Sequence, residues 1–318
     1  MYKGKKIALV VPAYNEQRLI KPTLTHVPAL IDKVYVVDDG SKDNTAEVIK
    51  SIMRKDKRIM LIKHKKNMGL GQALITGYKK SFEDKTDITV VVGGDYQMDL
   101  SEVDRFLEPI TSGQADYVKG NRFMEDEEVS KTMPFARVFG NSMLSLLTKF
   151  ATGYWKVYDS NDGYTALKTE VIGKIDWSKA TKGYGYNGDW MAMFNVKGVR
   201  IKDVPRKAIY LQGERQSQIK TFKYIRKVFP RLVWRFFWRI KRNYIIKDFH
   251  PLVLFYGMGF VLIPIGLIAG LDLVWIRLNG GAISGNTVVL TALLLITGFQ
   301  SLLFAILFDM QMNEKLQP

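Results

Sequence analysis

The chain has 318 residues, of which 47% are hydrophobic, and it carries a formal net charge of +16 at pH 7. It contains no cysteine, which excludes disulfide bonds, thiolate zinc sites and cysteine nucleophiles and fits a reducing compartment. Because it has only three histidines, a histidine-rich metal centre is not expected. The basic balance indicates an anionic partner, which could be nucleic acid, a membrane surface or a phosphate-bearing substrate.

Short apolar runs alternate with helix-like stretches along the N-terminal part of the chain. Strands are predicted over residues 7–11, 34–37, 59–62 and 88–92, and helices over 16–30, 44–54, 70–82 and from Ser101 onward. Continuous apolar strands that are separated by helices predict a mostly parallel sheet covered on both faces. The fold class is therefore α/β, with a nucleotide-binding architecture. A further helix is predicted over residues 135–156.

Polar residues follow each of the four predicted strands, in segments 12–16, 38–43, 67–71 and 93–97. Ligands of parallel α/β sheets bind beyond the carboxyl ends of the strands, so these segments are expected to converge. Taken singly, two of them have a plainer interpretation. Residues 38–43 could form only a turn that leads to a helix cap at Ser41 or Asp43, and residues 67–71 only a loop that glycine permits.

In order and spacing, these segments resemble the family-2 glycosyltransferases of the GT-A fold, in particular the polyprenyl-phosphate sugar synthases such as dolichol-phosphate mannose synthases. The matching sequences are VVPAYNE at 10–16, VVDDGS at 36–41, NMGLGQA at 67–73 and DYQ at 95–97. Residues 213–217 resemble, more weakly, the family's closing Gly-x-Ser element. The resemblance implies a GT-A catalytic domain over residues 1–215 that binds a nucleotide-sugar donor.

The resemblance also implies which residues hold that donor. They are Pro12, Tyr14, Glu16, Val37, Asp39, Gly71, Gly94 and Asp95. Val37 and Asp39 are expected beside the base, and a carboxylate such as that of Asp39 can accept hydrogen bonds from base N–H groups.

Asp95 and Gln97 match the family's metal-binding element, which implies a divalent cation, Mg²⁺ or Mn²⁺, on the donor diphosphate. Such hard cations take one or two carboxylates together with phosphate and water oxygens. The chain departs from the family here, because Gly93 stands where members usually carry the first Asp of Asp-x-Asp. Asp99 either assists the cation or caps the following helix, and capping is the favoured interpretation.

A phosphate acceptor is already ionised at neutral pH and needs no general base, whereas a hydroxyl acceptor does. Arginine suits a phosphate because its planar fork pairs with it in a bidentate way. The candidates are Arg122, Arg137 and Arg215, each of which could instead be a solvated surface residue. Asp95, Arg122 and Asp189 are the predicted catalytic residues. Asp189 stands where hydroxyl-acting members place their base, and with a phosphate acceptor it would only orient the sugar or cap a helix.

The C-terminal third of the chain has the features of a membrane anchor. Residues 216–249 mix basic and aromatic residues and predict amphipathic helices at an anionic membrane surface, which disfavours nucleic acid. Residues 250–310 predict two transmembrane helices, at about 251–275 and 286–308, followed by a tail at 311–318. The positive-inside tendency places the catalytic domain and the tail in the cytoplasm.

The predicted activity is inverting transfer of a hexose from a GDP- or UDP-linked donor to a polyprenyl or dolichyl phosphate at the cytoplasmic membrane face. One alternative is a family-2 enzyme that acts on a lipid or polysaccharide hydroxyl. The other is a non-catalytic membrane protein that binds sugar nucleotides. The sugar, the base, the prenyl chain and homo-oligomer formation stay open.

Overall fold

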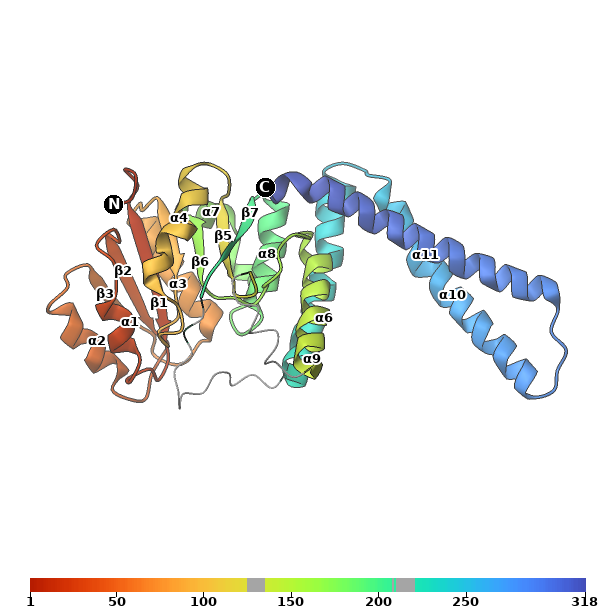
Figure 1. Ribbon diagram of the computed structural model, residues 1–318, viewed down its shortest axis with the longest axis horizontal. Helices are drawn as coiled ribbons and strands as arrows, with labels where there is room; N and C mark the ends of the chain where they lie inside the picture. Colours follow the sequence, from red (N-terminus) through yellow and green to blue (C-terminus); the bar gives the residue numbers. More distant parts are fainter. Residues whose placement is uncertain (125–134, 208, 210–220) are drawn as a thin grey trace. The chain divides into compact units, whose positions relative to one another are not determined.

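The computed structural model describes residues 1–124, 135–207, 209 and 221–318, and of residues 135–139, 141 and 221–225 it describes the backbone. The chain divides into two compact units (Figure 1). The first comprises Met1–Phe236 and Lys315–Pro318, and the second comprises Phe237–Glu314. The predicted division at residues 215, 249 and 310 into catalytic, interfacial, membrane and tail parts stays a prediction.

The first unit contains a seven-stranded sheet of order β3-β2-β1-β4-β6-β5-β7. The strands are β1 (Ile7–Ala13), β2 (Lys33–Asp38), β3 (Ile59–Lys63), β4 (Ile88–Val91), β5 (Tyr117–Asn121), β6 (Thr165–Lys168) and β7 (Ile201–Pro205). Only β6 runs against its neighbours β4 and β5, and the other paired strands are parallel. The prediction of a mostly parallel sheet is confirmed.

Helices cover both faces of this sheet (Figure 1). The helices described up to residue 241 are α1 (Ile20–Thr25), α2 (Thr45–Met53), α3 (Leu70–Glu83), α4 (Val103–Thr111), α6 (Phe135–Thr152), α7 (Thr169–Lys174), α8 (Tyr186–Val196) and α9 (Thr221–Lys241), with the 3-10 turns η1 (Leu100–Glu102) and η2 (Trp177–Lys179). Of these, α6 packs on α8 and α9 rather than on the sheet. The main apolar core joins α1, α2 and α4 to one face. On the other face α3 packs so closely on β1 that a Cβ on Gly77 would collide with the side chain of Val10. Leu144 and Ala151 of α6 pack on Val228 and Leu232 of α9.

Helix α1 is much shorter than the predicted helix over residues 16–30, since it spans only Ile20–Thr25. The reason lies in the backbone before it. The N–H groups of Asn15, Glu16 and Gln17 donate to the side chains of Ser41, Thr45 and Asp43, respectively. These hydrogen bonds hold the segment in an irregular conformation, in which Asn15 has a φ of 57°. The first polar segment is thereby fixed to the second.

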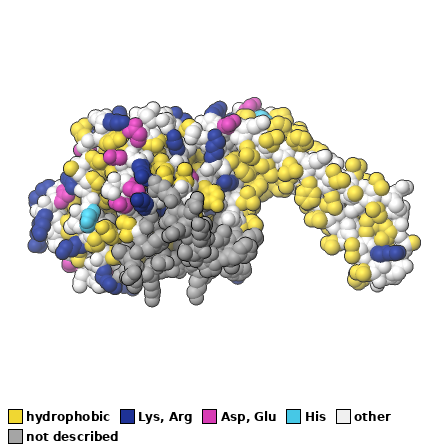
Figure 2. Space-filling model, in the orientation of Figure 1, with side chains coloured by type: hydrophobic (Ala, Val, Ile, Leu, Met, Phe, Trp, Pro, Cys, Tyr) yellow, Lys and Arg dark blue, Asp and Glu magenta, His cyan; other side chains and the backbone are white. Residues whose placement is uncertain are grey.

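The second unit contains the end of α9, a π-helical turn η3 (Arg242–Ile246) and two long helices, α10 (Leu252–Leu278) and α11 (Gly285–Asn313). Both long helices are apolar and long enough to cross a membrane, as predicted. Figure 2 shows hydrophobic side chains gathered over them on the face in view. They approach each other closely at glycines, because a Cβ on Gly266 would lie 2.8 Å from Leu295, and one on Gly298 would lie 2.8 Å from Ile263.

Candidate active site

The strand directions bring all the polar segments to one edge of the sheet. Strands β1 to β4 are parallel, and the antiparallel strand β6 pairs Thr165 with Val91 of β4 and with Lys119 of β5. Strand β7 is parallel to β5. The carboxyl ends of β1 to β5 and of β7 therefore open at the same edge as the segment that precedes β6. The predicted convergence is confirmed, and further polar residues join it.

Asp39 holds the loop after β3 against the end of β2. Its Oδ1 accepts hydrogen bonds from His64 Nδ1 at 2.7 Å and Met68 N at 2.9 Å, and its Oδ2 accepts one from Gly69 N at 2.8 Å. The side chain is almost fully buried. Contact between Asp39 and a base stays a prediction, and the structure assigns this carboxylate a loop-fixing role.

The other predicted donor residues differ in accessibility. Val37 is fully buried in β2, and Pro12 is buried in β1, where its carbonyl accepts from Gly94 N. Tyr14 is exposed, and Glu16 is partly exposed. In this conformation the side chains of Tyr14 and Glu16 are therefore accessible to a donor.

Gly71 and its neighbour Gly69 lie under a crossing segment of chain. A Cβ on Gly71 would lie 2.7 Å from the carbonyl oxygen of Thr181, and one on Gly69 would lie 2.7 Å from that of Lys182. Gly69 also has a φ of +95°, which favours glycine. Both glycines therefore have a packing reason to be glycine, and the donor-binding role of Gly71 stays a prediction.

The carboxylate of Asp95 lies beside Gly93, the residue that breaks the expected Asp-x-Asp pattern. A Cβ on Gly93 would lie 2.6 Å from Asp95 Oδ1, so the carboxylate occupies space that a side chain at position 93 would need. Burial raises the pKa of Asp95, against the opposing hydrogen bond from Gln97 N. Asp99 accepts from Ser101 N at 2.8 Å and caps η1, which is the interpretation favoured from the sequence.

Among the residues that the structure describes, no three histidine or carboxylate side chains are grouped so that they could hold a metal ion. Asp95 and Gln97 offer one carboxylate and one amide at the edge of the sheet where the polar segments converge, here called the ligand edge. That donor set fits a Mg²⁺ or Mn²⁺ ion that takes its other ligands from a diphosphate and from water.

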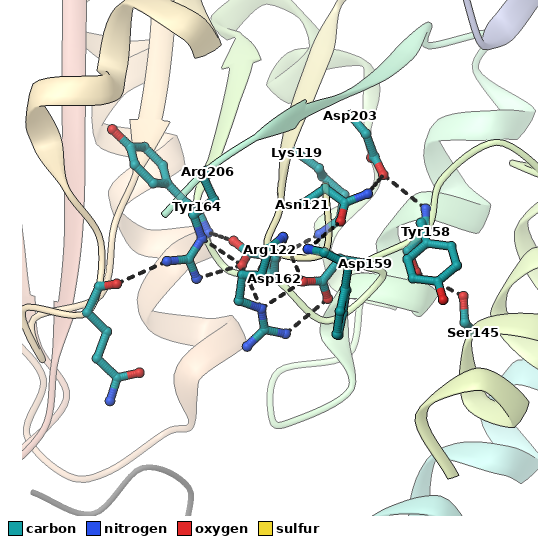
Figure 3. A network of polar contacts seen from close by, with 12 residues as sticks. Lys119, Asn121, Arg122, Ser145, Tyr158, Asp159, Asp162, Tyr164, Asp203 and Arg206 are labelled. Atoms are coloured by element: carbon teal, nitrogen blue, oxygen red, sulfur yellow. Dashed lines mark hydrogen bonds and ion pairs between the residues drawn. The ribbon is translucent and has the colours of Figure 1, made fainter. Parts of the chain in front are cut away.

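Arg122 lies at the end of β5 within a network of buried charges (Figure 3). Its Nε and Nη2 donate to the two carboxylate oxygens of Asp159 at 2.7 and 3.0 Å. Burial alone would raise the pKa of Asp159, but the charge and hydrogen bonds of Arg122 outweigh it and lower that pKa. The Arg122 side chain is 32% exposed, so a ligand can still reach it.

Several members of this network are absent from the predicted site. They are Lys119, Asp159, Asp162, Asp203 and Arg206. Asp159 and Asp162 precede β6, a strand that the apolar pattern did not predict. Lys119 is fully buried and donates to the carbonyl oxygen of Asp162 at 2.7 Å. A clue in the sequence is the aspartate pair at 159 and 162, a few residues before β6.

Asp189, on α8, is fully buried and paired with two arginines of α9. Its Oδ1 accepts from Nε of Arg231 and from Nε of Arg235, each at 2.6 Å, and its Oδ2 accepts from Thr181 N at 2.8 Å. Burial alone would raise the pKa of Asp189, but its bonds to Arg235 and Arg231 lower it. These contacts are unlike those of a general base, which needs a free lone pair and a pKa near the working pH.

For two predicted acceptor residues the side chain is not described. Arg137 lies in the first turn of α6, where its backbone alone is described, and Arg215 lies outside the described residues. Their acceptor roles stay predictions.

The family profile named "Glycosyl transferase family 2" matches residues 8–176, which is more than half of the chain. The chain belongs to glycosyltransferase family 2. This family-2 glycosyltransferase is 32% identical, over 65% of its own length and 87% of the relative, to UDP-N-acetylglucosamine–dolichyl-phosphate N-acetylglucosaminyltransferase of Methanococcus voltae. It is 27% identical, over 63% of its length and 76% of the relative, to polyprenol monophosphomannose synthase of Mycolicibacterium smegmatis.

The first unit of the glycosyltransferase has the GT-A fold, as predicted. It resembles glucosyl-3-phosphoglycerate synthase of Mycobacterium tuberculosis in complex with Mn²⁺, UDP and glucosyl-3-phosphoglycerate. The TM-score is 0.56 at 19% sequence identity, over 73% of this chain and 80% of the other. At this identity the likeness concerns the fold alone.

Proposed function

We propose that this family-2 glycosyltransferase moves a hexose or N-acetylhexosamine from a GDP- or UDP-linked donor to a polyprenyl or dolichyl phosphate, with inversion at the anomeric carbon. The named relatives that act on dolichyl and polyprenyl phosphates support this acceptor class. In this reaction an oxygen of the acceptor phosphate forms the new bond to the anomeric carbon. The bond to the donor diphosphate breaks, and the nucleoside diphosphate leaves with its electron pair.

The observation that carries the proposal is the pairing of Asp189 with Arg231 and Arg235. At the position where a hydroxyl-acting member would hold its base, this chain has a buried carboxylate that is already neutralised. A phosphate acceptor needs no proton removed, so it suits such a site better than a hydroxyl does. Arg122, at the ligand edge of the sheet and 32% exposed, would bind that phosphate through its guanidinium, which also pairs with Asp159.

Tyr14, Glu16 and the loops at the ends of β1 to β3 would hold the nucleotide. Asp95 and Gln97 would hold a divalent cation, which when bound would neutralise charge on the leaving diphosphate. Arg122 would place the acceptor phosphate beside the anomeric carbon, with Arg137 and Arg215 as further acceptor candidates. Positioning of this kind accounts for much of the rate in reactions between two bound partners.

The two apolar helices and the basic segment before them support a membrane location. Basic residues are dense before α10 and the linker between α10 and α11 holds none, so the positive-inside tendency favours a cytoplasmic catalytic unit. A lipid phosphate in the cytoplasmic leaflet is then the acceptor expected at this site.

A transfer assay on membranes that contain the protein tests the function. The membranes are given a polyprenyl phosphate and labelled UDP-N-acetylglucosamine, UDP-glucose or GDP-mannose, with Mn²⁺ or with EDTA. We expect label in the lipid phosphate fraction with one donor and with Mn²⁺ only. Asp95→Ala should abolish the transfer, and Arg122→Gln should lower kcat/KM for the acceptor by about 10- to 100-fold, the cost of a lost bond to a charged group.

Arg58→Gln is the control for Arg122. Arg58 also pairs with an aspartate, Asp56, but its other bonds go to the carbonyl oxygens of Val27, Pro28 and Ile31, in the segment before β2. It should alter stability and leave kcat/KM unchanged. Label in a hydroxyl-linked product would favour the alternative acceptor class, and donor binding without transfer would favour a non-catalytic protein. Full activity of Asp95→Ala would contradict the metal assignment.

A further inference from the structure

A buried ion pair joins Arg206 to Asp162 beside Arg122 (Figure 3), and Arg206 also contacts the segment 95–97. Arg206 follows β7 directly, and its Nε and Nη2 lie 2.8 and 2.6 Å from Asp162 Oδ2. The exposed fraction is 4% for the Arg206 side chain and 0% for that of Asp162. Neither residue belongs to the site predicted from the sequence.

Arg206 reaches the proposed metal segment through the backbone. Its Nη1 donates to the carbonyl oxygen of Gln97 at 3.0 Å, and Ile209 N donates to the same oxygen at 3.2 Å. Tyr96, between Asp95 and Gln97, has a φ of 54°. A non-glycine residue in this left-handed region is strained and persists only where its surroundings fix it. The bonds to the Gln97 carbonyl are part of what fixes it.

Asp162 reaches the proposed acceptor residue on the other side. Its Oδ2 lies 3.3 Å from Nε of Arg122, and its Oδ1 accepts from Tyr164 N at 2.7 Å. The chain leaves room for the pair at Gly120, where a Cβ would lie 3.0 Å from Arg206 Cγ and 3.0 Å from Asp162 Oδ1. The pair therefore contacts both sides of the proposed reaction centre.

A second arginine–aspartate pair, at the other end of β7, provides a comparison. Arg200 directly precedes β7, donates to both oxygens of Asp116 at 3.0 Å, and donates to the Gly113 carbonyl at 2.6 Å. It thus makes the same kinds of bond as Arg206, at the opposite edge of the sheet. Its side chain is 36% exposed. Burying a charged pair is a poor source of stability in itself, so the buried location of Arg206 calls for another reason.

We propose that Arg206 and Asp162 are positioning residues that fix the segment 95–97 and Arg122 relative to each other, so that the donor diphosphate and the acceptor phosphate are held at reacting distance. This inference rests on the proposed function. It predicts that loss of the pair weakens two binding events, although neither residue contacts a substrate.

The test compares Arg206→Gln and Asp162→Asn with the matched control Arg200→Gln in the full-length protein. Calorimetry measures binding of UDP and of GDP in the presence of Mn²⁺, and the transfer assay measures the acceptor KM. We expect Arg206→Gln to weaken nucleotide binding and raise the acceptor KM by about 10-fold each, the loss of a charge-assisted bond. Arg200→Gln should leave both within about twofold, as a change distant from the site does.

Arg206→Lys keeps the charge, but an ammonium group cannot reach both the Asp162 carboxylate and the Gln97 carbonyl as the planar guanidinium does. We therefore expect nucleotide affinity and acceptor KM between those of the wild type and Arg206→Gln. Arg206→Lys also serves if Arg206→Gln does not fold. Because the two residues act as one unit, the double variant with Asp162→Asn should be no worse than the more impaired single variant.

The proposal is overturned if Arg206→Gln binds the nucleotide as tightly as Arg200→Gln does, whether or not the wild type transfers sugar. If Arg206→Gln does not fold, the same comparison is made with Arg206→Lys. A weakened nucleotide affinity with an unchanged acceptor KM overturns the link to Arg122. If the wild type transfers nothing to any lipid phosphate, the proposed function fails, and the binding measurement still decides whether Arg206 orders the segment 95–97.

Discussion

Nε of Arg235 lies 2.6 Å from Oδ1 of Asp189, in a pair whose side chains are 1% and 0% exposed. The two residues belong to different helices, α9 and α8, and Arg231 adds a second bond to the same oxygen. Both arginines also donate to the carbonyl oxygen of Lys179. Asp189 therefore fastens α9, the helix that leads toward the apolar helices, to the catalytic unit.

Replacing Asp189 with Asn should destabilise the protein strongly. The change leaves the buried charge of Arg235 without its carboxylate, which typically costs about 3–5 kcal/mol. Thermal unfolding in detergent, followed by tryptophan fluorescence, measures the effect. Glu170→Gln is the control, because Glu170 forms an exposed pair with Lys174 that should contribute at most about 1 kcal/mol. Equal unfolding temperatures for the two variants would refute the fastening role.

Gly71→Ala should lower stability, because its new methyl group would lie 2.7 Å from the Thr181 carbonyl oxygen and 2.9 Å from the Lys182 carbonyl carbon. Backbone atoms cannot yield as a side-chain end can, so an overpacking cost of about 1–3 kcal/mol is expected. Gly183→Ala, in the same crossing segment, meets nothing within 4 Å and should be nearly neutral. Denaturant unfolding compares the two. A neutral Gly71→Ala that still weakens donor binding would favour the donor-contact role instead.

Asp203 should make stability depend on pH. Burial raises its pKa to about 6, against the bond from Tyr158 N and the charge of Lys119. Because this folded-state pKa exceeds the unfolded value of about 4, the native protein binds more protons between these values. The stabilisation is present below about pH 4 and is lost as pH rises through about 6.

The unfolding temperature of the wild type relative to Asp203→Asn should therefore fall between pH 4 and pH 7. Asp176→Asn provides a comparison of opposite sign, because hydrogen bonds from Ser178 and Lys179 lower the pKa of Asp176 to about 2. The wild type should gain stability over that variant as pH rises from about 2 to about 4. Parallel pH profiles for wild type and Asp203→Asn would rule out titration of Asp203 in this range.

Asp309→Asn should destabilise the second unit. Asp309 of α11 accepts from Nη1 and Nη2 of Arg239 at 2.7 and 2.9 Å and from the Tyr244 hydroxyl at 2.8 Å, and the exposed fractions of the Arg239 and Asp309 side chains are both 0%. Loss of the carboxylate leaves a buried guanidinium, at a cost of about 3–5 kcal/mol. The measurement is thermal unfolding in detergent.

Two further variants sharpen that prediction. The double variant Arg239→Met with Asp309→Leu replaces both charges by apolar groups and should recover most of the lost stability. Glu314→Gln, at an exposed neighbouring position, should be neutral. A double variant as unstable as Asp309→Asn would mean that the charges themselves hold the unit together.

The strands and helices predicted over residues 7–11, 34–37, 59–62 and 70–82 could be read from the sequence, because their apolar periodicity is local. The convergence of the polar segments followed from the direction rule for parallel strands. Strand β6, Thr165–Lys168, was not predicted because only two of its four residues are apolar, so it lacks the apolar run that marks the predicted strands. Asp159 and Asp162 were for the same reason not predicted as site residues, since their position depends on the register of that strand.

The sequence by itself determined the family, the α/β class and the two apolar helices, because each of these depends on residue types at short range, and the direction rule for parallel strands placed Asp95 among the converging polar segments. Tertiary structure alone decided which charges pair. Asp189 lies 46 positions from Arg235, and Asp162 lies 44 positions from Arg206. Periodicity carries no information about partners so far apart, and strand order and helix packing bring them within hydrogen-bonding distance.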